Sequence, residues 1–537
     1  MRNALLIGAA VLALLVDGFF ALVNFYPMAP QPDRGPPRYV LTSLNERQTR
    51  WFQTNMLDEF NDEHATNFVA RSVTEEELVG NVTHADVALA VLSAVDAERL
   101  ATNGQLSPFD SVATAADIAR DYGDVREDVL ESAKFQNRQY FLPRAIALDV
   151  AVFRISKVRD ALLNWQVVRP EIESALRAIN GRGLPAGYVL DQQAVDWDAY
   201  DVFVLAYYWS HRAYGGAHAQ PRVMHRTGLS VEAQLDVVAG MYRSGMTDAT
   251  LANRTAQPAV DWMQWEALYR QENLFAPEMF EPRGIDDEGI LEGITRGDVF
   301  FSSVDQMQAF TLHGGSYRGA RALVPDGDDL GFAPMPRFAS LALTEAGTPA
   351  RTADPFSFRE EFVWVLPKQS LAKERAYQLA AWIIEREDHA RECEALGILP
   401  MRTDIIRERE TLFREPWMQD VLEAGLDQWD RAQEPTATLL NALGVDHAVS
   451  WRRIVGATTT PTTVASELAT AMQQSVDRAA ELSAFNALPR HDDEKADAEG
   501  DAAEAAFALP PLREPMILEG LNRDAGVSDD ASLGGTP

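Results

Sequence analysis

The chain has 537 residues, several times the length of an ordinary domain of about 150 residues, so more than one folded unit is expected. Apolar residues make up 46% of it and charged residues 24%, which excludes wholesale disorder and a membrane protein with many spans. With 80 acidic and 48 basic residues the net charge is −32, and such a surface repels phosphate backbones, so no nucleic-acid partner is predicted. Cys393 is the only cysteine, which excludes an internal disulfide and a cysteine-based zinc site.

The N-terminal segment has the pattern of a membrane anchor. Arg2 precedes an apolar run over residues 4–25, long enough as a helix to cross about 30 Å of hydrocarbon. Residues 1–26 are therefore predicted to anchor the chain in the inner membrane. Because the positively charged end of such a helix stays in the cytoplasm, the body of the chain is expected on the other side, in the periplasm or at the cell surface. Cleavage of this segment as a signal peptide is the alternative. Residues 27–37 form a proline-rich linker.

After the linker, short apolar runs alternate with amphipathic stretches. This alternation predicts an α/β fold with two mainly parallel sheets flanked by helices. Strands are expected at 38–44, 67–73, 85–92, on either side of a bend at Pro143 within 139–153, and at 360–368. Helices are expected at 45–64, 96–106, 231–245 and 376–397. The acidic, Ala/Gly/Pro-rich composition of residues 488–537 predicts a disordered tail.

No motif for a common enzymatic chemistry is present. The chain has no phosphate loop, no G-x-G-x-x-G after a strand and no G-x-S-x-G elbow. His211, His218 and His225 recur every seven residues, but Gly215, Gly216 and Pro221 interrupt any continuous helix that would align them. No catalytic residue, metal or cofactor is therefore predicted.

Aromatic residues gather around Tyr208 and Trp209, and further tryptophans, including Trp451, are spread over the C-terminal half. They can be core residues or can stack on the flat face of a sugar ring, and the sequence leaves both interpretations open.

The order of seven segments resembles the extracellular solute-binding proteins of ABC importers, the maltose-binding-like family 1. The segments are "YVLTSLNERQTRWFQTNMLDEFNDEHA", "ADVALAVLSAVDAERLATNGQLSPFDSV", "NRQYFLPRAIALDVAVFRIS", "ITRGDVFFSSVDQMQAF", "DDLGFAPMPRF", "EEFVWVLPKQSLAKERAYQLAAWIIEREDHARECEALGILPMRTD" and "ATTTPTTVASELATAMQQSV". The resemblance implies a two-lobed periplasmic-binding-protein fold, type II-like, that closes on a solute. Lobe 1 is expected at 38–147 and 338–402, and lobe 2 at 148–337 and 403–487, with "DDLGFAPMPRF" as the second crossover between them.

The resemblance also places ligand contacts at the carboxyl ends of strands. By position these are Asn45, Glu46, Arg47, Ser93, Asp96, Tyr208, Trp209, Asp305, Gln306 and Trp451. Ser93 and Asp96 stand where the family often has an aromatic residue, Ala147 where it often has a carboxylate, and Asp305 where tryptophan is common. Acidic residues without stacking partners suit a cationic or very polar solute, whereas "RGDVFF" and "PMPRF" look most like carbohydrate binders.

The predicted function is therefore that of a membrane-tethered extracytoplasmic solute-binding protein of an ABC importer. It is expected to bind a sugar or oligosaccharide between its lobes, to deliver it to the permease subunits and to catalyse no reaction. Two alternatives stay open. One is a degenerate binding-protein fold that serves as a sensor or assembly subunit. The other is a secreted glycan-active enzyme, which needs two carboxylates about 5–9.5 Å apart in a cleft.

Overall fold

The computed structural model describes residues 35–73, 75–211, 222–228, 231–247, 250, 253–313, 329–429, 447–456 and 461–486. The predicted membrane segment 1–26, most of the linker and the acidic tail lie outside these ranges, as does His218. Within them, no helix is both long and apolar enough to cross a bilayer. The chain divides into two compact units, 1–480 and 481–537, and the described part of the second is the end of the last helix. All strands of the described residues lie in the first unit.

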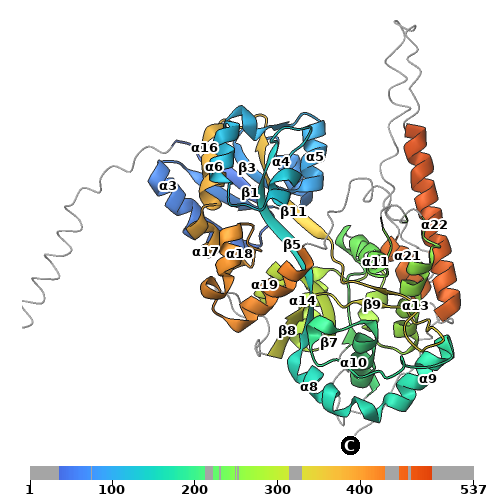
Figure 1. Ribbon diagram of the computed structural model, residues 1–537. Helices are drawn as coiled ribbons and strands as arrows, with labels where there is room; N and C mark the ends of the chain where they lie inside the picture. Colours follow the sequence, from blue (N-terminus) through green and yellow to red (C-terminus); the bar gives the residue numbers. More distant parts are fainter. Residues whose placement is uncertain are drawn as a thin grey trace, which may run out of the picture. The chain divides into compact units, whose positions relative to one another are not determined.

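The first part of the chain alternates short strands with helices and ends in the long strand β5 (Figure 1). Its elements are β1 (Arg38–Thr42), α2 (Glu46–Phe52), the π-helical turn η1 (Gln53–Leu57), α3 (Asp58–His64), β2 (Phe68–Ser72), α4 (Glu75–Asn81), β3 (Val87–Ser93), α5 (Ala94–Thr102), β4 (Leu106–Ser107), η2 (Phe109–Ser111), α6 (Ala115–Asp121), α7 (Glu127–Ser132) and β5 (Phe141–Arg154).

The middle of the chain is mainly helical. Its elements are α8 (Ile155–Asn164), η3 (Trp165–Val167), α9 (Arg169–Asn180), η4 (Ala194–Asp196), α10 (Ala199–His211), β6 (Arg222–Val223), α11 (Val231–Arg243), α13 (Gln257–Gln271), η5 (Pro277–Phe280), α14 (Asp287–Arg296), β7 (Val299–Asp305), α15 (Gln306–His313) and β8 (Leu330–Ala333).

The last part of the chain contributes β9 (Phe338–Ala339), β10 (Thr352–Ala353), β11 (Arg359–Pro367), α16 (Lys373–Ile383), α17 (Arg386–Leu396), α18 (Thr403–Leu412), α19 (Pro416–Trp429), α21 (His447–Val455) and α22 (Pro461–Asn486). The expected single helix at 376–397 is wrong, because α16 and α17 are separate helices. The backbone is not helical at Glu385, which has a ψ of 150° and is the N-cap of α17. Glu387 and Asp388 then lie in the first turn of α17, where negative charge favours a new helix start.

One nine-stranded sheet runs through the unit, in the order β2-β1-β3-β11-β5-β7-β6, with β4 beside β11 and β8 beside β5. We call the part around β2, β1, β3 and β4 lobe 1 and the part around β6, β7 and β8 lobe 2. In lobe 1, β1 pairs parallel with β2 and β3, as predicted. In lobe 2, β7 and β8 both pair antiparallel with β5, so a mainly parallel sheet is the wrong prediction for the described strands of this lobe.

Strand β5 connects the two lobes. Residues 141–148 pair with β11, and residues 149–154 pair with β7 and β8. The expected bend at Pro143 is wrong, since Pro143 lies inside one continuous strand. It sits where the register with β11 shifts, between the pairs Val363–Pro143 and Phe362–Ala145, and a register shift is a position at which a residue without an N–H is tolerated. The extra residue at the shift is Arg144.

The segment "DDLGFAPMPRF" was expected to be the second crossover, but its strand β8 pairs with the lobe 2 part of β5. Strand β11 is the one that pairs with both β3 of lobe 1 and the connecting strand β5. Residues that follow β8 also contact lobe 2. The Trp265 indole donates to the carbonyl of Ala339, and Asn180 donates to the carbonyl of Leu341. Residues 338–341, expected in lobe 1, therefore pack with helices α9 and α13 of lobe 2.

Arg144 forms a buried ion pair with Glu392 of α17. Arg144 Nη1 lies 2.8 Å from Glu392 Oε2, Nη2 contacts the other carboxylate oxygen, and the two side chains are 4% and 0% exposed. The guanidinium also lies over the ring of Trp364 on β11. The pair thus joins the connecting strand to the helices behind lobe 1.

Replacing Glu392 with leucine should lower the free energy of unfolding by about 3–5 kcal/mol, because the Arg144 charge would stay buried without its partner. Adding Arg144→Met to Glu392→Leu should restore most of this loss. Urea unfolding of the wild type, the single variant and the double variant measures both values. Equal stabilities of the single and double variants would contradict the assignment.

Candidate functional site

The alternation of side chains along β5 places Ala145, Ala147 and Asp149 on one face of the sheet. Across the ladders, Ala145 is opposite Phe362 and Ala147 is opposite Glu360, both on β11. Asp149 is opposite Asp305, the last residue of β7. Because alanine side chains are short, this face of the sheet has room beside Glu360 and Phe362.

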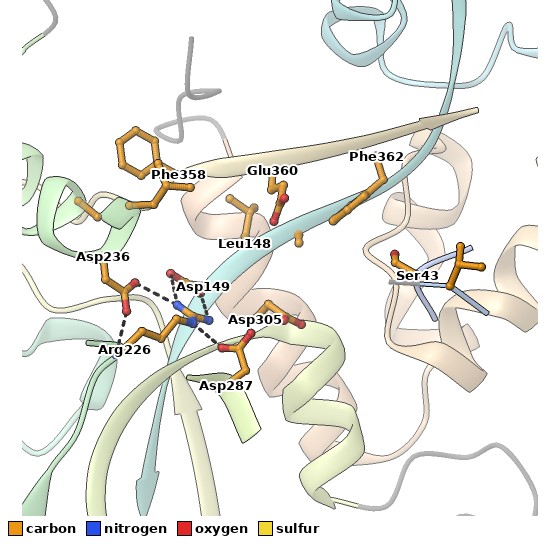
Figure 2. A pocket seen from close by; sticks show the side chains of 14 residues that line it. Ser43, Leu148, Asp149, Arg226, Asp236, Asp287, Asp305, Phe358, Glu360 and Phe362 are labelled. Carbon is orange, nitrogen blue, oxygen red and sulfur yellow. Dashed lines mark hydrogen bonds and ion pairs between the residues drawn. The ribbon is translucent and has the colours of Figure 1, made fainter. Parts of the chain in front are cut away.

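A cavity of about 440 Å³ lies over this face (Figure 2). Its walls come from both lobes and from the connecting strand, and they are Ser43, Val73, Ala147, Leu148, Asp149, Arg226, Leu235, Asp236, Ala239, Asp287, Asp305, Phe358, Glu360 and Phe362. A second cavity of about 280 Å³ shares Ser43, Ala147, Asp305, Glu360 and Phe362 with it. The second cavity continues over Asn45, Gln48 and Thr311. The shared residues make the two cavities neighbouring parts of one site, which we call the inter-lobe cavity.

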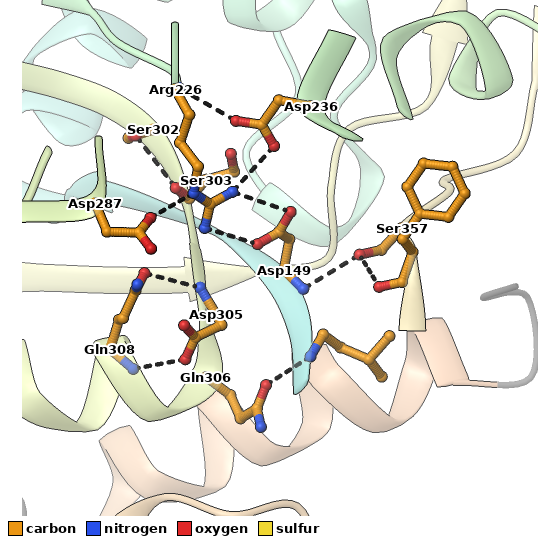
Figure 3. Close-up of polar contacts among 12 residues, drawn as sticks. Asp149, Arg226, Asp236, Asp287, Ser302, Ser303, Asp305, Gln306, Gln308 and Ser357 are labelled. Atoms are coloured by element: carbon orange, nitrogen blue, oxygen red, sulfur yellow. Dashed lines mark hydrogen bonds and ion pairs between the residues drawn. The ribbon is translucent and has the colours of Figure 1, made fainter. Parts of the chain in front are cut away.

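Arg226 organises the lobe 2 side of this cavity. Its side chain is 6% exposed and forms ion pairs with three aspartates, two of them at 3.3 Å (Asp149) and 3.0 Å (Asp236), the third being Asp287 (Figure 3). These carboxylates come from β5, α11 and α14. Burial lowers the pKa of Arg226, but the three carboxylates outweigh it and the pKa is raised well above its usual value. Every guanidinium nitrogen therefore contacts a carboxylate of the protein itself.

Asp305 lines both parts of the inter-lobe cavity. Its carboxylate accepts a 2.8 Å hydrogen bond from the Gln308 amide in the first turn of α15. Burial raises the pKa of Asp305 to about 7, against the hydrogen bond from Gln308, and the neighbouring carboxylates of Asp287 and Asp149 add to the rise. Two carboxylates directly opposite each other on neighbouring strands repel. Arg226 forms its ion pair with Asp149, and its charge also lowers the pKa of Asp305, but less than burial raises it.

Of the residues predicted to bind ligand, Asn45 and Asp305 line the inter-lobe cavity. Asn45 is also the N-cap of α2, where its side chain accepts from the amides of Arg47 and Gln48 at 3.0 Å each. Glu46 and Arg47 lie exposed in the first turn of α2 and do not line the cavity.

Ser93 and Asp96 also lie outside the lining of the inter-lobe cavity. Ser93 caps α5 by accepting a hydrogen bond of 3.3 Å from the Asp96 amide. Asp96 pairs with Arg99 one turn further along the helix, at 2.8 Å. Their contacts are those of a helix start.

The three predicted aromatic contacts belong to the interior of lobe 2. Tyr208 donates to Asp160 at 3.1 Å and Trp209 donates to the carbonyl of Lys157 at 3.0 Å, which joins α10 to α8. Trp451 is fully buried, stacks on Phe280 and donates to Glu266. None of the three lines the inter-lobe cavity. Their packing therefore agrees with the interpretation of these aromatic residues as core residues.

Gln306 is buried and holds the connecting strand. Its side-chain oxygen accepts from the Leu148 amide at 2.7 Å, and its side-chain nitrogen donates to the Ile146 carbonyl at 2.6 Å. Figure 3 shows Gln306 with the dashed line that leaves its side-chain oxygen. These two hydrogen bonds take the place of a pair of backbone hydrogen bonds between strands, just beyond the end of β7. At the next residue of β5, Ser357 accepts from the Asp149 amide and Gln428 donates to its carbonyl. Side chains thus form the hydrogen bonds of the backbone N–H and C=O groups where β5 passes from its ladder with β11 to its ladder with β7.

The sequence interpretation missed Arg226, Asp236, Asp287, Glu360 and Phe362. A signal existed for the last two, because "E-x-F" in β11 and "A-x-A-x-D" in β5 repeat with the period of two that places side chains on one face. No local signal exists for Arg226 and its aspartates, whose positions in the chain are far apart.

The remaining histidines and the cysteine are not grouped as a metal site in the part of the chain that the structure describes. Among the described residues, no three His, Cys, Asp or Glu side chains are grouped to hold an ion. His211 stacks on Tyr207, and His225 lies 3.3 Å from Glu266. Cys393 is buried in α17, and burial raises the pKa of its thiol well above the usual value, which is the environment of an unreactive thiol.

The solved structures that resemble the chain include MalE3 of T. maritima with bound maltose, at a TM-score of 0.59 and 14% identity over 82% of this chain and 100% of that one. Another is the substrate-binding protein Lmo0181 of Listeria monocytogenes in complex with cycloalternan, at 0.58 and 11% over 82% and 100%. A third is UgpB of Mycobacterium tuberculosis in complex with glycerophosphocholine, at 0.56 and 15% over 83% and 99%. No protein-family model and no curated protein matches the chain. At these identities the likeness shows the fold, which is the two-lobed α/β fold of maltose-binding-type proteins.

The raised pKa of Asp305 predicts a pH dependence of stability. The native state keeps the Asp305 proton up to about pH 7, whereas the unfolded chain releases it near its ordinary pKa of about 4. The contribution of this group to the free energy of unfolding should therefore be lost as the pH rises from about 4 to about 7. Asp305→Asn removes the titration, so its stability relative to the wild type should be higher at about pH 8 than at about pH 5.

Urea unfolding at both pH values measures this difference. The matched control is Asp427→Asn, which changes an exposed aspartate on α19 and should give the same relative stability at both pH values. An Asp305→Asn variant with no change between the two pH values would show that Asp305 is not the titrating group.

Proposed function

We propose that the protein is an extracytoplasmic solute-binding protein that holds a sugar or oligosaccharide in the inter-lobe cavity and delivers it to the permease of an ABC importer. The observation that carries this proposal is the position of the cavity, which has walls from both lobes and lies over the strand that connects them. The solved structures with this fold include proteins in complex with maltose and with cycloalternan. Residues 4–25 are the proposed anchor that holds the body at the inner membrane.

The lining of the cavity suits a polar ring. Carboxylates such as Glu360 accept hydrogen bonds from hydroxyl groups, Asn45 offers an amide, and Phe362 offers an apolar face for the C–H side of a sugar. Contacts from both lobes to one solute favour a closed arrangement, and the difference between open and closed forms is what a permease can recognise. No reaction is part of the proposal, because a receptor of this kind only has to bind and release.

The proposal is tested by thermal unfolding of the full chain with glucose, maltose, longer glucans, amino acids and polyamines. A solute that binds the native state alone stabilises it by about 2.7 kcal/mol at about a hundredfold excess over its Kd. We expect a rise in Tm with a sugar, and we expect Ala147→Leu to abolish it, because the added side chain fills the space opposite Glu360. The matched control is Ala342→Leu at an exposed position, which should keep the full rise.

Three outcomes contradict the proposal. Equal stabilisation of Ala147→Leu and the wild type would place the solute elsewhere. No stabilisation by any solute would favour a degenerate sensor or assembly subunit. Hydrolysis of a glucan during the assay would favour a glycan-active enzyme.

A further inference from the structure

We infer that the solute of the inter-lobe cavity is amphipathic. Its sugar ring lies in the larger part of the cavity, and a short aliphatic chain on that ring lies in the smaller part, against Leu291, Met307 and Phe362. The inference rests on the proposed function, because it concerns the ligand of the same cavity. It adds the chemical class of that ligand, and it distinguishes the site from one built for a chain of hydroxylated rings.

The first argument is the apolar wall of the smaller part. Leu291 of α14, Met307 of α15 and Phe362 of β11 line this part, and the rest of the protein covers each of them only partly. Leu44 and Val91 line it from lobe 1. Partly covered apolar side chains around a concave space are stabilised when an apolar group displaces the water. Apart from Phe362 these side chains are aliphatic, and methionine and leucine adapt their shape to a flexible chain.

The second argument is that the polar side chains of the smaller part are bonded to the protein's own backbone. Five of them form such a hydrogen bond through their oxygen, at 3.0–3.3 Å, and they are Thr42, Asn45, Gln48, Gln308 and Thr311. Arg144, which also lines this part, is paired with Glu392. A ring with several hydroxyl groups has to compete with the backbone for these oxygens, whereas an aliphatic chain needs no hydrogen-bond partner.

The third argument places the sugar ring in the larger part. Asp149, Asp236 and Asp287 surround Arg226 there, and Asp305 lies across the ladder from Asp149 (Figure 2). An ionised carboxylate has about four acceptor positions, so an aspartate that is paired with a guanidinium can also accept hydrogen bonds from hydroxyl groups. Because Arg226 is occupied by its aspartates, the larger part favours a neutral ring with several hydroxyl donors over an anionic group.

The two parts of the cavity are joined where one molecule can extend from one into the other. Ala147 and Phe362 line both parts. Ala147 has a short side chain, so the bond between the ring and the chain can pass over it. The solute would then contact aspartates of lobe 2 at one end and Leu44 and Val91 of lobe 1 at the other.

The test compares solutes that differ in the length of the chain. Methyl, butyl and hexyl glucoside, each as both anomers, are titrated into the full chain by calorimetry below the micelle concentration of the hexyl compound, alongside glucose, maltose and 1-hexanol. Each CH₂ group that leaves water strengthens binding about fourfold. We therefore expect hexyl glucoside to bind about tenfold more tightly than butyl glucoside, and more tightly than maltose.

Met307→Gln tests whether the chain lies in the smaller part, because it keeps the length of the side chain and replaces its apolar end with an amide. It should lower the ratio of hexyl to butyl affinity about threefold or more, since the amide would lose its hydration without gaining a partner. The matched control is Leu371→Gln, at a leucine that is 71% exposed and outside the cavity, and it should keep the ratio. Leu291→Asn supplies a second variant should Met307→Gln unfold.

The outcomes separate this inference from the proposed function. Equal affinity for the three glucosides, or tighter binding of maltose than of hexyl glucoside, would overturn the inference and leave the proposed function standing. A gain with chain length that is the same in the wild type and in Met307→Gln would place the chain elsewhere and overturn the inference. Binding of 1-hexanol as tightly as hexyl glucoside would contradict both, because the sugar would then contribute nothing.

Discussion

Strand β5 is the constraint on which the rest of the unit depends, because one continuous backbone has to serve two lobes. Its first part is held by β11 and its second part by β7 and β8. At Leu148 and Asp149, where the ladders with β11 and β7 end, the backbone also donates to the side chains of Gln306 and Ser357 and accepts from Gln428. A backbone that is held by side chains rather than by a full ladder can change its dihedral angles locally without losing a neighbouring strand. The inter-lobe cavity lies at this same place, with Leu148 and Asp149 in its lining.

Arg226 and its three aspartates line the same cavity on the side of lobe 2. A buried arginine with three carboxylates is stable only when all of its partners are in position, because removal of one partner leaves a charge uncompensated in a medium of low dielectric constant. Asp149, Asp236 and Asp287 therefore have little freedom, and they form a rigid wall. Glu360 and Phe362 of β11 also line the cavity, and they are opposite Ala147 and Ala145 of β5.

The fold could be predicted from the sequence where the signal is local. Short apolar runs predicted β1, β2, β3 and β11, and the amphipathic period predicted the helical stretch from Glu46 to His64. The prediction failed where a tertiary contact decides the outcome. Pro143 sits inside a strand because the register with β11 shifts there, and the tryptophans that could have stacked on a sugar are satisfied by partners in the interior of lobe 2. Gln306 was expected to contact a ligand, but its side-chain amide forms hydrogen bonds with the backbone of β5.

The buried Cys393 has a practical consequence for watching the lobes move. A thiol reacts with maleimide dyes as the thiolate, and this one is both covered and held protonated by its surroundings. Two cysteines introduced on the surface, one in each lobe, could therefore be labelled in the native protein without first removing the natural one. The distance between the two dyes in single molecules would then show whether the lobes move relative to each other when a solute is added.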